Sequence, residues 1–334
     1  MGFVFLVIFA FRYAKKRTLF RSGQHETSYR PLFYRLLQIR IKKTFMNKLK
    51  IFIFISVILF AFSCKKTETQ IITGNQPAID STIDNVLRDN FIHKAYLAII
   101  GRTPTDLEKI GARTVIDKNN CTVQSREDLL NILFSASDYK ENIFNIDNAG
   151  LLASYSGDVI NYYIIYYTNL LKDTANINYY MYKDYITRLY LLKAAPRNFF
   201  NDSIDLVEVH KRMTFNILYD NVNGGLFNWT ATVFPYFLKR KPTQAEMNSS
   251  SLFIQGMQGQ ILLKTGSSTN DMVNIFFSSD EYFEGQVRIL FLRHLFREPT
   301  FSELQQLSDA YKKDHNYIKL QKSIFLSNDF LGKK

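Results

Sequence analysis

The sequence predicts a predominantly all-α protein, built as a bundle of helical repeats in two lobes. Apolar residues recur with helical spacing over most of the chain after residue 83, and the alternating runs typical of strands are scarce. The heptapeptide pattern R-x-P-T-x-x-E occurs three times. With 334 residues, of which 46% are hydrophobic, the chain can bury the core of one large or two ordinary domains.

Residues 46–63 predict a secretory signal peptide. Lys48 and Lys50 form a short basic head, and an apolar run over residues 51–62 follows it. This run is shorter than the roughly 20 residues that a membrane span needs. The ending Ala61-Phe62-Ser63-Cys64 resembles the lipobox of bacterial lipoproteins. The alternative is a buried hydrophobic helix that happens to end in a cysteine.

The resemblance to lipoproteins implies that the chain is cut before Cys64, which then carries acyl chains on its thiol and its new amino group. Two or three acyl chains anchor a protein stably where one chain does not. Lys65 follows the cysteine, and by the same resemblance this favours the outer membrane, with the periplasmic face and the cell surface both left open. Residues 64–82 are polar with Gly, Pro and Thr, which predicts a flexible tether.

A signal peptide belongs at an N-terminus, so we expect Met46 to be the true start and residues 1–45 to be a non-native upstream extension. The formal net charge of +12 would suggest a nucleic-acid or membrane partner. Residues 1–63, however, hold 12 of the 42 basic and one of the 30 acidic residues. The remaining chain has 30 basic and 29 acidic residues, a net charge of +1, and we therefore expect no nucleic-acid partner.

The heptapeptide predicts a corner between two helices. Its threonine is a good N-cap for the second helix, and the glutamate three residues on completes a capping box. The proline stops the preceding helix, and the arginine is expected at that helix's C-terminal end, where it can meet unpaired carbonyls. The corner residues are Arg102, Pro104, Thr105 and Glu108; Arg240, Pro242, Thr243 and Glu246; and Arg297, Pro299, Thr300 and Glu303. The alternative is an Arg–Glu constellation that binds an anion, but capping accounts for every fixed position.

The repetition extends beyond the heptapeptide. An aromatic residue lies six positions before each arginine, and a serine followed by another aromatic residue lies downstream. These aromatic residues are Tyr96, Phe234 and Phe291 upstream, and Tyr139, Tyr282 and Phe330 downstream. Each repeat is therefore expected to contain a helix, a capped corner, a second helix, a loop of variable length and a third helix.

The repeats suggest a division of the folded body at the Gly-rich turn after residue 222. We expect an N-terminal lobe at 83–222 with the first repeat and a C-terminal lobe at 223–334 with the other two. Between them, residues 150–230 are rich in tyrosine, which predicts helices with aromatic packing faces. Whether this stretch holds a worn repeat stays open.

The segments "IIGRTPTDLE" (99–108) and "HLFREPTFSELQQL" (294–307) resemble modules of large surface proteins of planctomycete- and Bacteroidota-type bacteria. The resemblance covers about half of the chain after the signal peptide. It implies a helical repeat module and brings no defined activity with it.

Motifs of known chemistry are missing from the sequence. It contains no HExxH pair, no phosphate-binding loop, no G-x-G-x-x-G and no G-x-S-x-G. We therefore predict no catalytic residue, cofactor or metal, and a protein that is not an enzyme. The expected function is that of a lipid-anchored binding or scaffold subunit of an outer-membrane or cell-surface complex, with the bilayer and an envelope protein as partners. The alternatives are a glycan-binding lipoprotein that uses exposed aromatic residues and, third, an envelope hydrolase.

Overall fold

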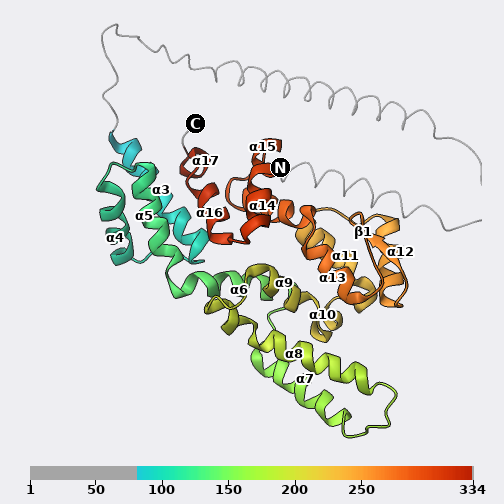
Figure 1. Cartoon of the computed structure of the whole chain (residues 1–334). Coiled ribbons are helices and arrows are strands. Elements are labelled where there is room, and N and C mark those ends of the chain that lie inside the picture. Colours follow the sequence, from blue (N-terminus) through green and yellow to red (C-terminus); the bar gives the residue numbers. More distant parts are fainter. Residues whose placement is uncertain (1–80, 333–334) are drawn as a thin grey trace, which may run out of the picture. The chain divides into compact units, whose positions relative to one another are not determined.

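The computed structural model describes residues 81–332 and the side-chain environments of residues 85–332. This part of the chain is predominantly helical, which confirms the predicted fold class (Figure 1). Extension 1–45, signal peptide 46–63, Cys64 and all but the end of the tether lie outside the described residues, so their roles stay predictions. None of the described helices combines the length and the apolar composition needed to span a bilayer.

The first half of the described chain contains only helices and their connections. Their bounds are α3 (Ser81–Ile99), α4 (Asp106–Asp117), α5 (Val123–Phe134), α6 (Ser137–Leu152), α7 (Gly157–Leu170), α8 (Tyr179–Phe200), α9 (Leu206–Thr214) and α10 (Ile217–Val222). The predicted Gly-rich turn follows α10, with Gly224 and Gly225 at φ +79° and +98°, where residues without a Cβ are favoured.

The second half is also helical, apart from one short hairpin. Its elements are η2 (Leu226–Asn228), α11 (Trp229–Val233), the π-helical turn η3 (Phe234–Leu238), α12 (Gln244–Ile254), β1 (Gly259–Ile261), β2 (Lys264–Gly266), α13 (Thr269–Phe277), α14 (Asp280–His294), α15 (Phe301–Asp314), α16 (Tyr317–Phe325) and α17 (Asn328–Leu331). The two strands pair antiparallel, with Gly259 opposite Gly266. The sequence analysis predicted no strand pair here, so this hairpin is an addition that the structure reveals.

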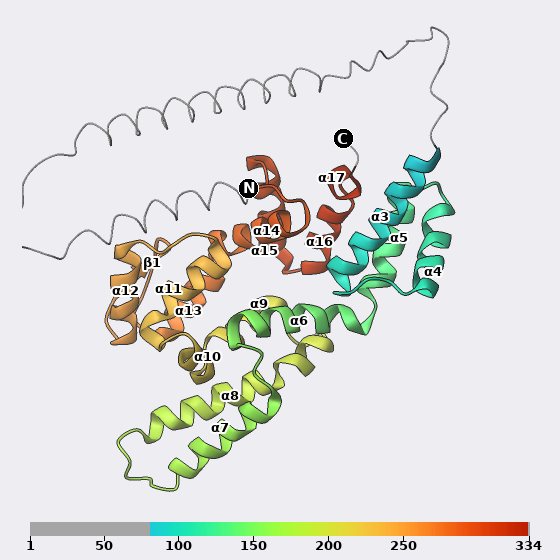
Figure 2. The same ribbon diagram turned by 180° about the vertical axis from the view of Figure 1, so that it is seen from behind.

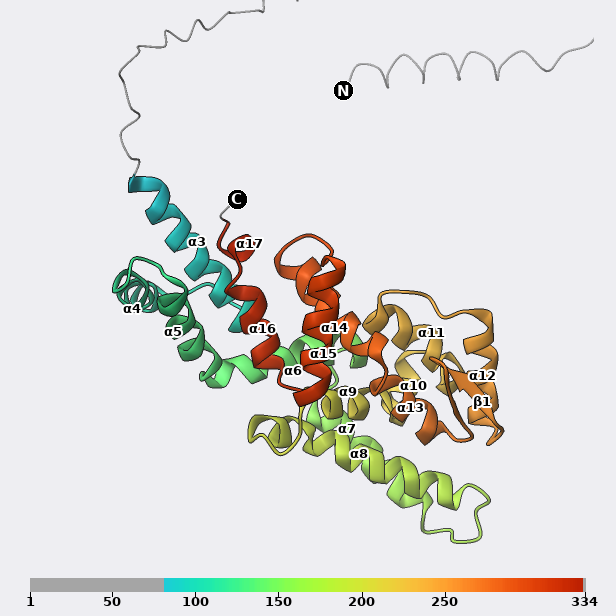
Figure 3. The same cartoon turned by 45° about the horizontal axis from the view of Figure 1, so that its top comes forward.

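The elements follow the order of the predicted repeats, with one helix more in each. Repeat 1 runs α3, corner, α4, α5 and α6, and repeat 2 runs α11 with η3, corner, α12, α13 and α14. Repeat 3 begins on the same α14 and continues through α15, α16 and α17 (Figure 3). The hairpin β1–β2 lies between α12 and α13, which explains why the second repeat has the longest variable segment.

The first and third repeats pack against each other. Helix α17 packs on α3, and α16 packs on α5. Buried Arg126 of α5 donates a hydrogen bond to the carbonyl of Leu326 at 3.1 Å, and the Tyr139 hydroxyl donates to Gln321 Oε1 at 2.7 Å. The described residues, 81–332, lie within one compact unit. The expected lobes, 83–222 and 223–334, therefore do not have separate cores, because contacts between distant repeats join them.

Aromatic side chains fill much of this shared core. Trp229, Phe237 and Phe276 are fully buried, and the Phe276 ring lies 5.3 Å from Trp229 and 6.1 Å from Phe237, both in edge-to-face arrangements. Such pairs add to the free energy gained from burying the rings. Among the described residues, most of the phenylalanines thus serve the core.

Helices α7 and α8 form a hairpin that projects from the rest of the described helices (Figures 1 and 2). Helix α8 packs on α6, α9 and α10, whereas α7 packs mainly on α8. The buried face of α7 contains Ile160, Ile164 and Tyr167. Within the described part of the chain, its opposite face is therefore left exposed.

Candidate functional site

All three heptapeptides form helix corners with a complete capping box. The hydroxyls of Thr105, Thr243 and Thr300 accept from the backbone N–H three residues on, at 3.2–3.3 Å. The glutamates at those positions accept in return from the threonine N–H at 2.7 Å in each corner. These contacts satisfy two otherwise unpaired donors at the start of α4, α12 and α15.

The corner arginines differ from the sequence-based expectation. Each guanidinium donates two hydrogen bonds of 2.7–2.9 Å to the capping-box glutamate of its own corner. It does not bond the last carbonyls of the preceding helix, as the sequence analysis had expected. The one carbonyl that each arginine reaches belongs to the next residue of the corner itself. The flat guanidinium fork matches a carboxylate in this two-point geometry, which explains the preference.

The preceding helix ends before the proline is reached. The residue directly before each arginine adopts a left-handed conformation, with φ +83° at Gly101, +58° at Lys239 and +56° at Phe296. Such a residue is a common helix terminator. The proline three residues later therefore follows a helix that has already ended.

A second carboxylate completes each corner. Asp138, Glu281 and Asp329 each directly precede the downstream aromatic residue of their repeat. The closest nitrogen–oxygen distances to the corner arginine are 3.8 Å for Asp138 and 2.6 Å for both Glu281 and Asp329. The sequence analysis missed these acids, although their fixed place before the aromatic residue was a usable signal.

The upstream aromatic residue covers the arginine in two of the three corners. The guanidinium of Arg240 lies 5.0 Å from the ring centre of Phe234, and that of Arg297 lies 4.9 Å from Phe291. Because each arginine faces two carboxylates of its own repeat, an external anion would meet negative charge there. The geometry therefore favours a structural role for the corners over anion binding.

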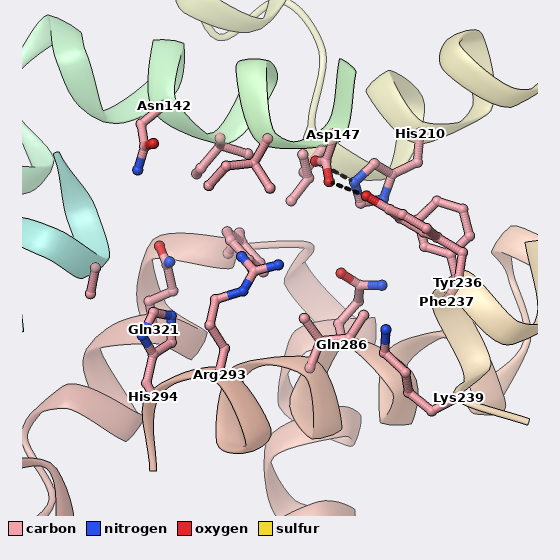
Figure 4. Close-up of a pocket in the computed structure, with 16 residues that line it drawn as sticks. Asn142, Asp147, His210, Tyr236, Phe237, Lys239, Gln286, Arg293, His294 and Gln321 are labelled. Atoms are coloured by element: carbon pink, nitrogen blue, oxygen red, sulfur yellow. Dashed lines mark hydrogen bonds and ion pairs between the residues drawn. The ribbon is translucent and has the colours of Figure 1, made fainter. Parts of the chain in front are cut away.

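The strongest candidate for a ligand site is a cavity of about 100 Å³ where the three repeats meet (Figure 4). Helices α3, α6, α9, α14 and α16 line it, together with η3 and the corner that follows η3. A π-helical turn widens the backbone locally and is often found at functional sites. Here it brings Tyr236 and Phe237 to the cavity wall, with Lys239 just beyond it.

One wall of the cavity holds a buried hydrogen-bonded chain. His210 is 2% exposed, and its ring nitrogens lie 2.7 Å from the Tyr282 hydroxyl and 2.9 Å from Asp147 Oδ2. The Tyr236 hydroxyl donates to the other oxygen of Asp147 at 3.2 Å. Burial and the nearby Asp147 carboxylate raise the pKa of Tyr236, so its hydroxyl stays protonated. Both ring nitrogens of His210 are therefore engaged by side chains of the protein itself.

The opposite wall holds three hydrogen-bond donors, of which Gln286 is buried and Lys239 and Arg293 are exposed. Lys239 and Arg293 make no ion pair with any residue that the structure describes. Burial, and then the Arg293 charge, lower the pKa of Lys239. Gln286 is 3% exposed, and its Nε2 has no hydrogen-bond partner in the described protein. Burial and Arg293 also lower the pKa of His294 to about 4, so this imidazole is neutral near pH 7.

The sequence analysis did not single out His210, His294, Lys239, Gln286 or Arg293. Within residues 85–332, no group of three or more His, Cys, Asp or Glu side chains could hold a metal ion. Comparison of the chain with protein-family models, with curated proteins and with solved structures gives no match. The interpretation of the site therefore rests on its geometry and chemistry.

Proposed function

We propose that the protein is a lipid-anchored envelope protein that acts by binding a protein partner through the outer face of α7. Three large side chains form this face. Tyr162, Ile165 and Tyr166 are 63%, 62% and 46% exposed. Their spacing of i, i+3 and i+4 places them side by side on one surface of the helix. This exposed apolar face is the observation that carries the proposal.

The composition of the α7 face suits a protein partner. Residues 159–170 contain no charged side chain, and tyrosine and isoleucine predominate. The centres of protein interfaces are depleted in charge and enriched in aromatic residues. The rings of Tyr162 and Tyr166 stack with centroids 6.4 Å apart, which gives the face a preformed shape. A rigid amphipathic surface of this kind can bind with little loss of conformational entropy.

A glycan is the alternative ligand for this face, because exposed tyrosine rings can stack on sugars. Ile165 between the two tyrosines favours a protein, since an aliphatic side chain offers a sugar neither a flat surface nor a hydrogen bond. Of the hydrolases in the third alternative, a glycosidase finds little support in the central cavity, because glycoside hydrolysis normally uses two carboxylates on opposite sides of the scissile bond. Asp147 is the one carboxylate lining the central cavity among the described residues.

Membrane attachment enters the proposal through Cys64 and the tether. Acylation of Cys64 would hold the helical body at the outer membrane, and the polar tether would let α7 reach a partner at the periplasmic face or the cell surface. A lipid-anchored scaffold gains from this arrangement because attachment to one membrane raises the effective concentration of both partners.

The α7 face is tested by placing a photo-crosslinking amino acid at position 162 and irradiating intact envelopes. Position 301 serves as the control, since Phe301 of α15 is 80% exposed and lies outside the α7 face. We expect one discrete adduct from position 162 and none from 301. The same partner should co-purify in a fixed ratio with the wild type and be lost with Tyr162→Lys/Tyr166→Lys. Equal adducts at both positions would refute the proposal, and glycan binding lost in the double variant would favour the alternative.

The anchor is tested separately with Cys64→Ala. We expect metabolic labelling with an alkyne fatty acid to mark the wild type and not the variant, and the variant to leave the membrane fraction. Cys121→Ala is the matched control and should keep both the label and the membrane attachment. Labelling that persists in Cys64→Ala would rule out the anchor while leaving the α7 experiment interpretable.

A further inference from the structure

The central cavity brings three hydrogen-bond donors together. Gln286 and Arg293 are seven residues apart on α14, two helical turns, and so lie on the same face of that helix. Lys239 follows η3 in the left-handed conformation that ends the π-helical turn. Figure 4 shows all three side chains extending toward the space beneath α6.

One of these donors, the buried Gln286 amide, has unmet bonding capacity, whereas Lys239 and Arg293 are exposed to water. A buried polar group without a partner costs about 1–3 kcal/mol, so native proteins rarely keep one without a reason. The Gln286 amide is such a group, and the two neighbouring cations repel each other without a carboxylate between them. An anion at this point would satisfy the amide and relieve the repulsion at the same time.

The remaining walls define the size and charge of the ligand. Ile143, Leu206 and Ile289 provide apolar surface next to the donors. Asp147 contributes one negative charge, against the two positive charges of Lys239 and Arg293. The cavity is large enough for several water molecules or one small organic acid. These features suit a monovalent anion with a short apolar part.

We propose that the cavity binds a small monocarboxylate, whose carboxyl group is held by Arg293, Lys239 and Gln286. Arg293 offers the planar fork that fits a carboxylate, and the Gln286 amide donates from the buried end. The aliphatic part of the ligand lies against Ile143 and Ile289. The site is independent of the α7 face and of the lipid anchor.

The test uses the full chain in detergent and follows binding by titration calorimetry and by thermal unfolding. Sodium propionate is the probe, and propionamide, which has the same shape without the charge, is the comparison. Inorganic phosphate and sulfate are tested at the same ionic strength. We expect saturable binding of propionate, with a rise in the unfolding temperature that grows with its concentration, and no binding of propionamide.

Variants then identify the donors. Arg293→Gln should weaken propionate binding about tenfold or more, and Lys239→Gln by a similar factor, because charged hydrogen bonds are lost. Gln286→Leu should weaken it about three- to tenfold, while the ligand-free protein unfolds at the same or a higher temperature. Arg197→Gln removes an exposed charge on α8 and should leave binding unchanged. Circular dichroism establishes that each variant is folded.

Several results would overturn the proposal. Equal binding of propionamide would show that charge is not recognised, and tighter binding of phosphate or sulfate would replace the monocarboxylate with another class of anion. If Arg197→Gln weakened propionate binding as much as Arg293→Gln, the binding would depend on the overall charge of the protein and not on a contact with Arg293. Finally, if the folded wild type binds none of the four probes, the cavity is not a binding site for small anions.

Discussion

The residue before each corner arginine shows how a single backbone angle limits the choice of side chain. A left-handed conformation costs a residue with a Cβ about 1–2 kcal/mol, and glycine avoids this cost. The first corner has Gly101 there, whereas the other two have Lys239 and Phe296. At the third corner, packing of the side chain offsets little of this cost, because Phe296 is 86% exposed.

Phe296→Gly should therefore stabilise the protein by about 0.5–1 kcal/mol, the strain removed less the greater flexibility of glycine in the unfolded chain. Chemical denaturation measures this difference. Gly101→Ala is the reverse change and should destabilise, because φ is +83° and the new Cβ would lie 2.3 Å from Asn142 Oδ1. A Phe296→Gly variant less stable than the wild type would indicate that the exposed ring makes a contact of value.

The corner glutamates make the stability of the folded protein depend on pH. The bidentate bond from Arg297 and the N–H of Thr300 lower the pKa of Glu303 to about 2, from an ordinary value of 4.5. The folded pKa lies below the unfolded one, so the stabilisation is complete above about pH 4.5 and is lost as the pH falls toward 2. The Glu108 carboxylate behaves in the same way, with its pKa also lowered to about 2 by Arg102 and Thr105.

We expect Glu303→Gln to flatten the fall of the unfolding temperature between pH 5 and pH 2, as followed by circular dichroism in that range. The double variant Glu108→Gln/Glu303→Gln should flatten it further. The reference is Glu141→Gln, which changes an exposed acid of α6 that makes no described ion pair. Parallel curves for the wild type and Glu303→Gln would contradict the assigned role of the corner.

At the scale of the elements, the sequence predicted the contacts between residues close together in the chain. It did not predict the contacts that form only when two helices pack together. The threonine and glutamate of a capping box contact each other within one turn, so their spacing alone predicted the starts of α4, α12 and α15. The arginine's partner lies six residues away across the corner, and its second acid lies on a later helix. These contacts depend on how the corner turns, which local propensities do not specify.

The contact between α14 and η3 depends on one glycine. A Cβ on Gly285 would lie 1.9 Å from the carbonyl oxygen of Phe237, so the two backbones touch at this point. Both segments border the central cavity. A side chain at position 285 would push α14 away from η3 and separate Gln286 from Lys239.

Gly285→Ala should consequently destabilise the protein by about 3 kcal/mol or more, because the obstructing atom is backbone and cannot rotate away. Gly111→Ala provides the matched control, since it makes the same change in α4 at a position with no atom within 4 Å. That variant should gain about 0.5–1 kcal/mol from helix propensity. Equilibrium denaturation of the two variants side by side distinguishes packing from propensity, and similar results for both would refute the close contact.

At the scale of the whole molecule, the repeated motif correctly predicted helices. It did not predict their closure, that is, the packing of the third repeat against the first. Repeats that stack in sequence order contact only their neighbours, whereas here the third repeat returns to the first. The central cavity follows from this closure, because its walls come from helices far apart in the chain. Gln286 and Arg293 lie on one face of α14, yet no pattern in the sequence places Lys239 beside them or Asp147 opposite them.

Because α17 packs on α3, a change in α17 should also affect α3. Phe330 is 1% exposed, and its ring lies 5.8 Å from Phe91 of α3 and 4.7 Å from Phe325 of α16. Lys94 of α3 also donates to the Phe330 carbonyl at 3.1 Å. Phe330→Ala should cost about 3–5 kcal/mol through the cavity it leaves, whereas Phe301→Ala, at an exposed site, should cost little.

Hydrogen exchange of the Phe330→Ala variant shows whether the repeats form one cooperative unit. In a linear array the loss would stay within α15, α16 and α17, because the energy of each repeat depends on its sequence neighbours. In the closed arrangement α3 loses the partner of Phe91, so amides of α3 should exchange faster by a factor similar to those of α16. Unchanged protection of α3 beside a loosened α16 would mean that repeats 1 and 3 touch without stabilising each other, and the cavity between them would then lack a rigid frame.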